Sequence, residues 1–179
     1  MNCLSNLTID NYLTIVSILL GSIGGLVAII QWCSSIKLRR AEFIDKIINI
    51  TRFDEGISKT MLIIDYDENN NWYNDKFHNK NKELEYQIDK LLAYIDYVCY
   101  LYNEEIISYN EFIVLEYKVT RICSSLSART YLWNLYHYSK IRMNAVCSFI
   151  NLINYGIINK ILPNDFKENC TNLYKRYLF

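Results

Sequence analysis

The sequence predicts an all-α protein with a single N-terminal transmembrane helix followed by a helical bundle. Three observations predict this class. No charged residue lies between Asp10 and Lys37, and apolar residues elsewhere recur at three- and four-residue steps, as on one face of a helix. The chain has one proline and five glycines, too few for a turn-rich β fold. We therefore expect two parts, an anchor at 1–36 and a helical bundle at 37–179.

The uncharged segment has the length and the flanks of a membrane span. The 21 residues from Tyr12 to Trp32 would form about 31 Å of helix, which matches a hydrocarbon core of about 30 Å. Eleven of them are Leu, Ile or Val, and the two aromatic residues at its ends suit the membrane interfaces. A buried core helix is the alternative, which the length disfavours. No A-x-A cleavage motif follows, so we expect a retained anchor rather than a signal peptide.

The charges after this segment predict its orientation. Lys37, Arg39 and Arg40 follow the apolar run, and no Lys or Arg precedes it. By the positive-inside rule, the N-terminus lies outside and 37–179 face the cytoplasm. Abundant Tyr, Ile, Asn and Lys are typical of an AT-rich bacterial genome, so the expected location is the inner (cytoplasmic) membrane, crossed once.

Small residues along the span predict that the anchor self-associates. Ser17, Gly21 and Gly25 recur every four residues, and Gly24 and Ala28 form a second pair beside them. Small side chains at this spacing leave a shallow groove, in which a neighbouring helix backbone can approach closely. The expected partners are the lipid bilayer and further copies of the chain. Chance spacing is the alternative, because glycine is common in membrane helices.

Helical periodicity continues beyond the span. The segment "LRRAEFIDKIINITRF" contains no Gly or Pro, so the first helix should run on to Phe53. A short helix is expected around 56–64, followed by a polar loop at 65–82. Three aromatic residues of this loop are expected to hold it against the core: Trp72, Tyr73 and Phe77.

The second half of the chain predicts several more helices. One has an apolar stripe over five turns, formed by Leu84, Ile88, Leu91, Leu92, Ile95, Val98, Cys99 and Tyr102. Ser108 and Glu111 form a capping-box pattern at the start of the next helix. That helix continues through Phe112, Leu115, Val119, Ile122 and Leu126. Further helices are expected at 128–141, at 143–160 and after Pro163, where Phe166, Cys170 and Leu173 recur.

The cysteines and histidines do not form a metal-site pattern. The chain has six cysteines without a C-x-x-C pair and two histidines, so no spacing supports zinc ligation. We expect reduced thiols that act as small apolar side chains, and neither a metal nor a cofactor.

Charge is unevenly distributed along the bundle. Residues 42–116 contain sixteen acidic and seven basic side chains, a net charge of −9, whereas 117–163 contain no acid and have a net charge of +6. The six basic residues are Lys118, Arg121, Arg129, Lys140, Arg142 and Lys160. Three interpretations remain open: pairing within the bundle, docking of neighbouring subunits, or a basic surface formed by the first five for RNA or anionic lipid.

One helical segment, "ARTYLWNLYHYSKIR", contains the residue types needed for acid–base chemistry. Arg129 and His137 lie eight residues apart, about 12 Å along a helix, and Asn134 lies almost one turn before the histidine. These residues would suit RNA cleavage across a dimer. The arginine would bind a phosphate, the histidine would transfer a proton and the asparagine would orient the reacting groups. The alternative is that Leu132, Trp133 and Tyr136 belong to the core, while Arg129 and His137 lie satisfied at the edge of the helix.

The chain resembles a large group of uncharacterised bacterial single-span membrane proteins. Three features carry the resemblance: the span, the basic "KLRR" exit and the stretch "KLLAYIDYVCYLYNEEIISYNEFIVLEYKVTRI". The overall plan is also similar to the small membrane accessory proteins of type VI-B CRISPR systems, whose cytosolic part is a divergent HEPN-like bundle. This resemblance implies ring-like assembly, a membrane pore and enhanced antiviral defence. HEPN ribonucleases carry Arg and His separated by four to six residues, whereas seven residues separate Arg129 from His137 here.

Three functions follow as expectations. The first is a membrane-anchored oligomeric accessory or effector protein of bacterial antiviral defence, which acts at the membrane. The alternative is a non-enzymatic scaffold that tethers a cytosolic effector protein. The third is a divergent HEPN-like ribonuclease that acts on RNA through Arg129, Asn134 and His137. An enzyme is the least favoured of these expectations.

Overall fold

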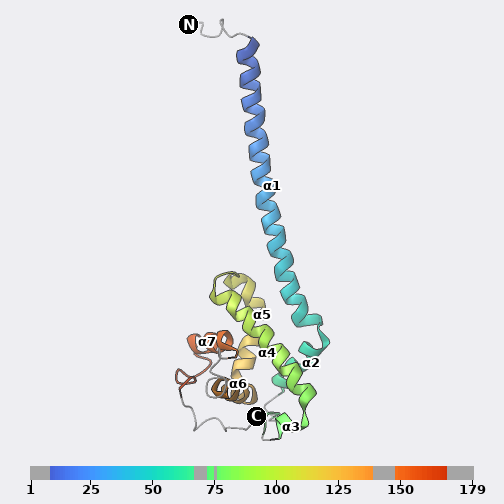
Figure 1. Cartoon of the computed structure of the whole chain (residues 1–179), viewed down its shortest axis with the longest axis vertical. Helices are drawn as coiled ribbons and strands as arrows, with labels where there is room; N and C mark the ends of the chain where they lie inside the picture. Colours follow the sequence, from blue (N-terminus) through green and yellow to red (C-terminus); the bar gives the residue numbers. More distant parts are fainter. Residues whose placement is uncertain (1–8, 67–71, 75, 139–147, 169–179) are drawn as a thin grey trace. The chain divides into compact units, whose positions relative to one another are not determined.

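The computed structural model describes residues 9–66, 72–74, 76–138 and 148–168, and their regular structure is entirely α-helical (Figure 1). No strand occurs in these residues, which confirms the predicted all-α class. The chain divides into two compact units, Met1–Lys46 and Ile47–Phe179.

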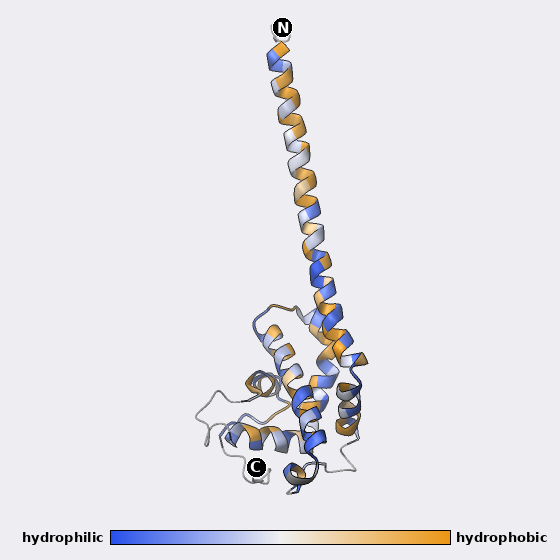
Figure 2. Cartoon of the chain, turned by 45° about the vertical axis from the view of Figure 1, so that its right-hand side comes forward, coloured by the Kyte–Doolittle hydropathy of each residue, from blue (hydrophilic) through white to orange (hydrophobic). Residues whose placement is uncertain are grey.

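The first unit contains most of helix α1 (Ile9–Phe53). Among the described residues, α1 is the one helix that is long and apolar enough to cross a membrane, and none of its most apolar window is buried. Figure 2 shows apolar colours along the first part of this helix and more hydrophilic colours along the part that follows. The helix is unbroken from the apolar segment to Phe53, as the absence of Gly and Pro predicts.

The second unit begins with the last turns of α1 and is built around α4 (Lys82–Asn103), which contacts α2 (Glu55–Asp65), α3 (Phe77–Lys80), α5 and α7. The central residues of its predicted apolar stripe are fully buried: Ile88, Leu91, Leu92, Ile95, Val98 and Cys99. The two end residues of the stripe, Leu84 and Tyr102, are half-buried. Burial of one continuous stripe on α4 therefore organises the core of this unit.

Helix α5 (Tyr109–Ser124) begins at the predicted cap. The backbone N–H of Ser108 donates to the Glu111 carboxylate at 2.7 Å, and the serine hydroxyl donates to the same oxygen at 2.6 Å. The helix ends earlier than predicted because Ser125 has an extended backbone conformation. Leu126 therefore does not continue the apolar face of α5. It opens α6 (Leu126–Tyr138) and is 55% exposed.

The last described helix, α7 (Ile150–Ile158), is shorter than the helix predicted at 143–160. Phe149 has a left-handed backbone with φ of 58°, which prevents the helix from extending further toward the N-terminus. Residues 143–147 and 139–141 lie outside the described residues. Beyond Pro163 the described residues form turns rather than the predicted helix, although Phe166 is fully buried as its pattern suggested. Cys170 and Leu173 lie outside the described residues.

Part of the polar segment at 65–82 is helical. Helix α2 extends to Asp65, and α3 forms inside the segment. Trp72, Tyr73 and Phe77 are at most 7% exposed, which confirms that these aromatic residues hold the segment against the core.

Candidate functional site

The predicted self-association face lies on α1, within the first unit. Ser17, Gly21, Gly24, Gly25 and Ala28 are all exposed. A Cβ atom added at any of these three glycines would meet no atom of another residue within 4 Å, apart from the helix backbone around it. The apolar residues between them are about half exposed or more. The small-residue face therefore has room for another helix, and the described residues leave it uncovered.

The residues predicted to be catalytic lie together on α6 but are largely enclosed. Asn134 is 3% exposed, and its Nδ2 donates to the Thr130 carbonyl at 2.8 Å. His137 is 7% exposed, and its ring centre lies 4.4 Å from that of Trp133. Arg129 is half-buried, and its buried Nε has no hydrogen-bond partner. Leu132, Trp133 and Tyr136 are buried, as the core alternative expects, but His137 is buried with them and does not lie at the edge of the helix.

Two of the predicted basic-surface residues make contacts within the second unit. The Lys118 ammonium donates to the Thr51 carbonyl at 2.6 Å. Arg121 donates to the backbone carbonyl of Asp65 and lies 3.4 Å from its carboxylate. Burial lowers the pKa of Lys118, and repulsion from Arg52 lowers it further. These bonds join α5 to α1 and α2, which favours pairing within the bundle for these two side chains.

The other basic residues are placed differently. Lys140 and Arg142 lie outside the described residues. Lys160 is exposed and has a left-handed backbone with φ of 59°. Within the described residues, a continuous basic surface is therefore not assembled from the predicted set.

One cluster of titratable side chains was not predicted from the sequence. It joins the segment that contains Trp72, Tyr73 and Phe77 to α4 and α6. We call Tyr73, His78, Glu85, Asp89 and Tyr131 the histidine cluster. His78 Nδ1 lies 2.6 Å from the Glu85 carboxylate, and the side chain of this histidine is 8% exposed. Its Nε2 lies 3.2 Å from the Tyr73 hydroxyl. The Tyr131 hydroxyl donates to Asp89 at 2.7 Å.

Burial dominates the electrostatics of the histidine cluster. It raises the pKa of Asp89, which the hydrogen bond from Tyr131 partly opposes and the nearby Glu85 charge reinforces. Burial and the Asp89 charge together raise the pKa of Tyr131. The four aromatic residues Trp72, Tyr73, Phe77 and Tyr131 pack with ring centres 5.0 to 5.9 Å apart. The cluster is built to hold elements together rather than to expose a nucleophile.

The sequence contained one signal for this cluster. Glu85 and Asp89 are four residues apart and therefore lie on the same side of a helix, beside a loop that contains one of only two histidines. Their pairing with His78 could not be read from that spacing, because it depends on how the loop returns to α4.

A pocket of about 600 Å³ lies between α2 and the start of α4. Glu55, Gly56, Lys59, Thr60 and Ile63 line it from α2, and Asn81, Lys82, Glu83, Leu84 and Gln87 line it from the other side. Two acids, Glu55 and Glu83, and two bases, Lys59 and Lys82, are among these residues, and Lys59 pairs with Glu55 at 2.5 Å. Among the described residues, no group of acidic, histidine or cysteine side chains is arranged to hold a metal.

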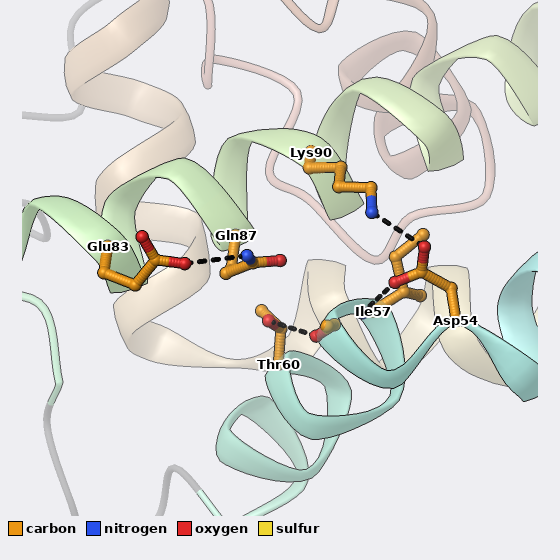
Figure 3. Close-up of polar contacts among 7 residues, drawn as sticks. Asp54, Ile57, Thr60, Glu83, Gln87 and Lys90 are labelled. Atoms are coloured by element: carbon orange, nitrogen blue, oxygen red, sulfur yellow. Dashed lines mark hydrogen bonds and ion pairs between the residues drawn. The ribbon is translucent and has the colours of Figure 1, made fainter.

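Polar contacts beside this pocket fix α2 against α4 (Figure 3). The Asp54 carboxylate accepts from the Ile57 N–H at 2.9 Å, which caps α2, and from Lys90 of α4 at 2.7 Å. The amide of Gln87 donates to Glu83 at 2.9 Å. Its oxygen lies only 2.3 Å from the position of a Cβ added to Gly56, so a side chain at this position would require the end of Gln87 to move.

Comparison with protein-family models, with curated proteins and with solved structures finds no match to this chain.

Proposed function

We propose that the chain is a single-pass membrane protein that assembles through α1 and keeps its helical unit in the cytoplasm as a non-enzymatic accessory module. One observation carries the proposal: the apolar part of α1 is long enough to cross a membrane and is not buried by the described residues. In water this surface would be costly to leave exposed, since each Å² of apolar surface contributes about 25 cal/mol when it is buried. A lipid bilayer and a second α1 helix would cover it.

The orientation in this proposal rests on charge. Lys37, Arg39 and Arg40 follow the span, whereas the described residues before it contain only Asp10 as a charged side chain. Retention of this basic cluster on the cytoplasmic side places the helical unit in the cytoplasm.

An accessory role fits the helical unit better than catalysis. The acid–base residues predicted on α6 are enclosed, and the histidine cluster uses its polar atoms to connect α3, α4 and α6. General acid–base catalysis requires a group within reach of a substrate proton. Asn134 and His137, at 3% and 7% exposure, are poorly placed for this.

Assembly is tested by changing Gly21 and Gly25 to leucine. Leucine keeps the segment apolar and favours the helix by roughly 1 kcal/mol per site over glycine, so the variant should still enter membranes. The added side chains would hold a partner helix away and remove its close contacts. We therefore expect a smaller species in mild detergent, measured by light scattering after size-exclusion chromatography.

The matched control changes Ile18 and Ile29 to leucine, which should leave the size unchanged. An unaltered oligomer in the glycine variant would contradict assembly through this face. The same pair of variants extends the proposal to antiviral defence. If the assembled protein acts on the membrane during phage infection, the glycine variant should lose both phage protection and any change in membrane potential, and the isoleucine control should retain them.

A further inference from the structure

Helix α1 carries three basic residues directly after its apolar part, and two of them share one face. Lys37, Arg39 and Arg40 are all exposed. Because α1 is unbroken from Ile9 to Phe53, the angle between two of its side chains follows from a turn of about 100° per residue. Lys37 and Arg40 are then about 60° apart around the helix, whereas Arg39 lies about 160° from Lys37. Lys37 and Arg40 therefore form a pair to which Arg39 does not belong.

This basic pair continues an apolar face of the span. Leu26 and Ile30 precede Lys37 by eleven and seven residues, so both lie within about 20° of it around the axis. They are 62% and 64% exposed. Arg39, in contrast, follows Gly21 by eighteen residues, about five full turns, and so lies in line with the small-residue face. The basic pair is therefore on the side of α1 that would face lipid when the small-residue face contacts another copy.

The depth of the basic pair in a membrane follows from the rise of the helix. The span ends near Trp32, and Lys37 and Arg40 follow it by about 8 Å and about 12 Å along the axis. The headgroup layer is about 5 to 8 Å thick on each side of the hydrocarbon core. Side chains of a helix lean toward its N-terminus, which for these residues is the direction of the span. Long basic side chains at these two positions therefore reach back into the headgroup layer.

The acids of the first unit lie on other sides of α1. The two that follow the span are Glu42 and Asp45. Glu42 is about 140° from Lys37 and about 160° from Arg40 around the axis, and Asp45 is about 80° and about 140° from them. The face that carries the basic pair is therefore positively charged.

We propose that Lys37 and Arg40 bind the phosphate of an anionic phospholipid of the cytoplasmic leaflet, whose acyl chains lie along Leu26 and Ile30. Anionic lipids attract basic segments next to a span. The guanidinium group of an arginine can donate two hydrogen bonds to one phosphate, and a lysine adds a point charge. A soluble phosphate would meet the same two charges but would leave the apolar residues without a contact. This inference rests on the proposed membrane span and adds a ligand to it.

Lipid retention by the full-length protein tests this site. The protein is placed in nanodiscs that contain equal amounts of phosphatidylglycerol and phosphatidylcholine, and the lipids that it retains on release are counted by native mass spectrometry. Both lipids are present on both faces of a nanodisc, so the result does not depend on the orientation of the chain in cells. We expect the native protein to retain phosphatidylglycerol in preference to phosphatidylcholine.

Two variants at nearly the same depth separate a site from a general attraction. Arg40→Gln should reduce the preference for phosphatidylglycerol by about fivefold, and adding Lys37→Gln should reduce it by about thirtyfold in total, as expected for one and two charges lost at a membrane surface. Arg39→Gln, the matched control, also removes one charge but lies on another face, so it should reduce the preference less than about twofold. Lys37→Arg combined with Arg40→Lys retains both charges and should retain the preference.

Three results would overturn the inference. The first is a native protein that enters nanodiscs but retains both lipids equally. The second is an equal loss in Arg39→Gln and Arg40→Gln, which would show diffuse attraction to the membrane. The third is displacement of the retained phosphatidylglycerol by soluble glycerol phosphate, which would show that the acyl chains do not contribute. A native protein that fails to enter nanodiscs would instead refute the membrane span, on which the site depends.

Discussion

Asp89, a single side chain of the histidine cluster, makes the stability of the folded protein depend on pH. Burial raises the pKa of this carboxyl above its ordinary value of 3.8. The folded protein therefore holds the proton more tightly than the unfolded chain. As pH rises from about 4 through the raised pKa, the folded state must lose that proton at a cost, so the contribution of Asp89 to stability falls with increasing pH.

Asp89→Asn should remove this pH-dependent cost. The asparagine oxygen can still accept from the Tyr131 hydroxyl, which in the native protein donates to Asp89 at 2.7 Å. We expect the variant to be as stable as the native protein at pH 7, or more stable by up to about 1 kcal/mol. Its melting temperature should also change less between pH 4 and pH 7, as measured by circular dichroism in detergent. The control Asp65→Asn, which weakens the contact with Arg121, should destabilise. A lower melting temperature for Asp89→Asn at pH 7 would show that this carboxylate is favoured in its charged form.

At the scale of the helices, the sequence predicted those elements that depend only on local residue patterns. The α4 stripe and the start of α5 at Ser108 follow from the spacing of apolar residues and from a cap within four residues. The early end of α5 depends on the extended backbone of Ser125, which no periodicity reveals. The histidine cluster and the late start of α7 depend on contacts between residues far apart in the chain. Such contacts are not encoded in a local pattern.

The start of α7 illustrates this dependence and can be tested. The N-cap residue, Phe149, provides no side-chain hydrogen bond. Instead, Asp96 of α4 accepts from the Leu152 N–H at 2.8 Å and from the Asn151 amide at 3.0 Å. Asp96→Ala should therefore destabilise the protein by about 1 kcal/mol, the usual cost of losing a helix cap, and should speed hydrogen exchange of the first amides of α7.

Asp96→Asn serves as the matched control, because it retains an oxygen that can accept from Leu152 and should recover most of the lost protection. If alanine and asparagine exchange equally fast, the negative charge rather than the hydrogen bond stabilises the start of α7.

At the scale of the whole molecule, some charges of the separate acidic and basic segments bond to each other within the second unit. Lys118 and Arg121, from the acid-free segment, bond to the backbone and carboxylate groups of α1 and α2. These bonds account for two of the six basic residues.

The orientation of the whole chain gives the last prediction. Lys37, Arg39 and Arg40 should keep the C-terminal side of α1 in the cytoplasm, because basic residues next to a span resist translocation. In intact cells, a tag placed before Met1 should be digested by external protease, and a tag after Phe179 should be protected until the cells are opened. Changing the three basic residues to glutamate and placing lysines near Ser5 should weaken insertion or invert it, whereas changing them to a different basic residue should have no effect. Digestion of the C-terminal tag in intact cells would reverse the topology, and the helical unit would then face the outside.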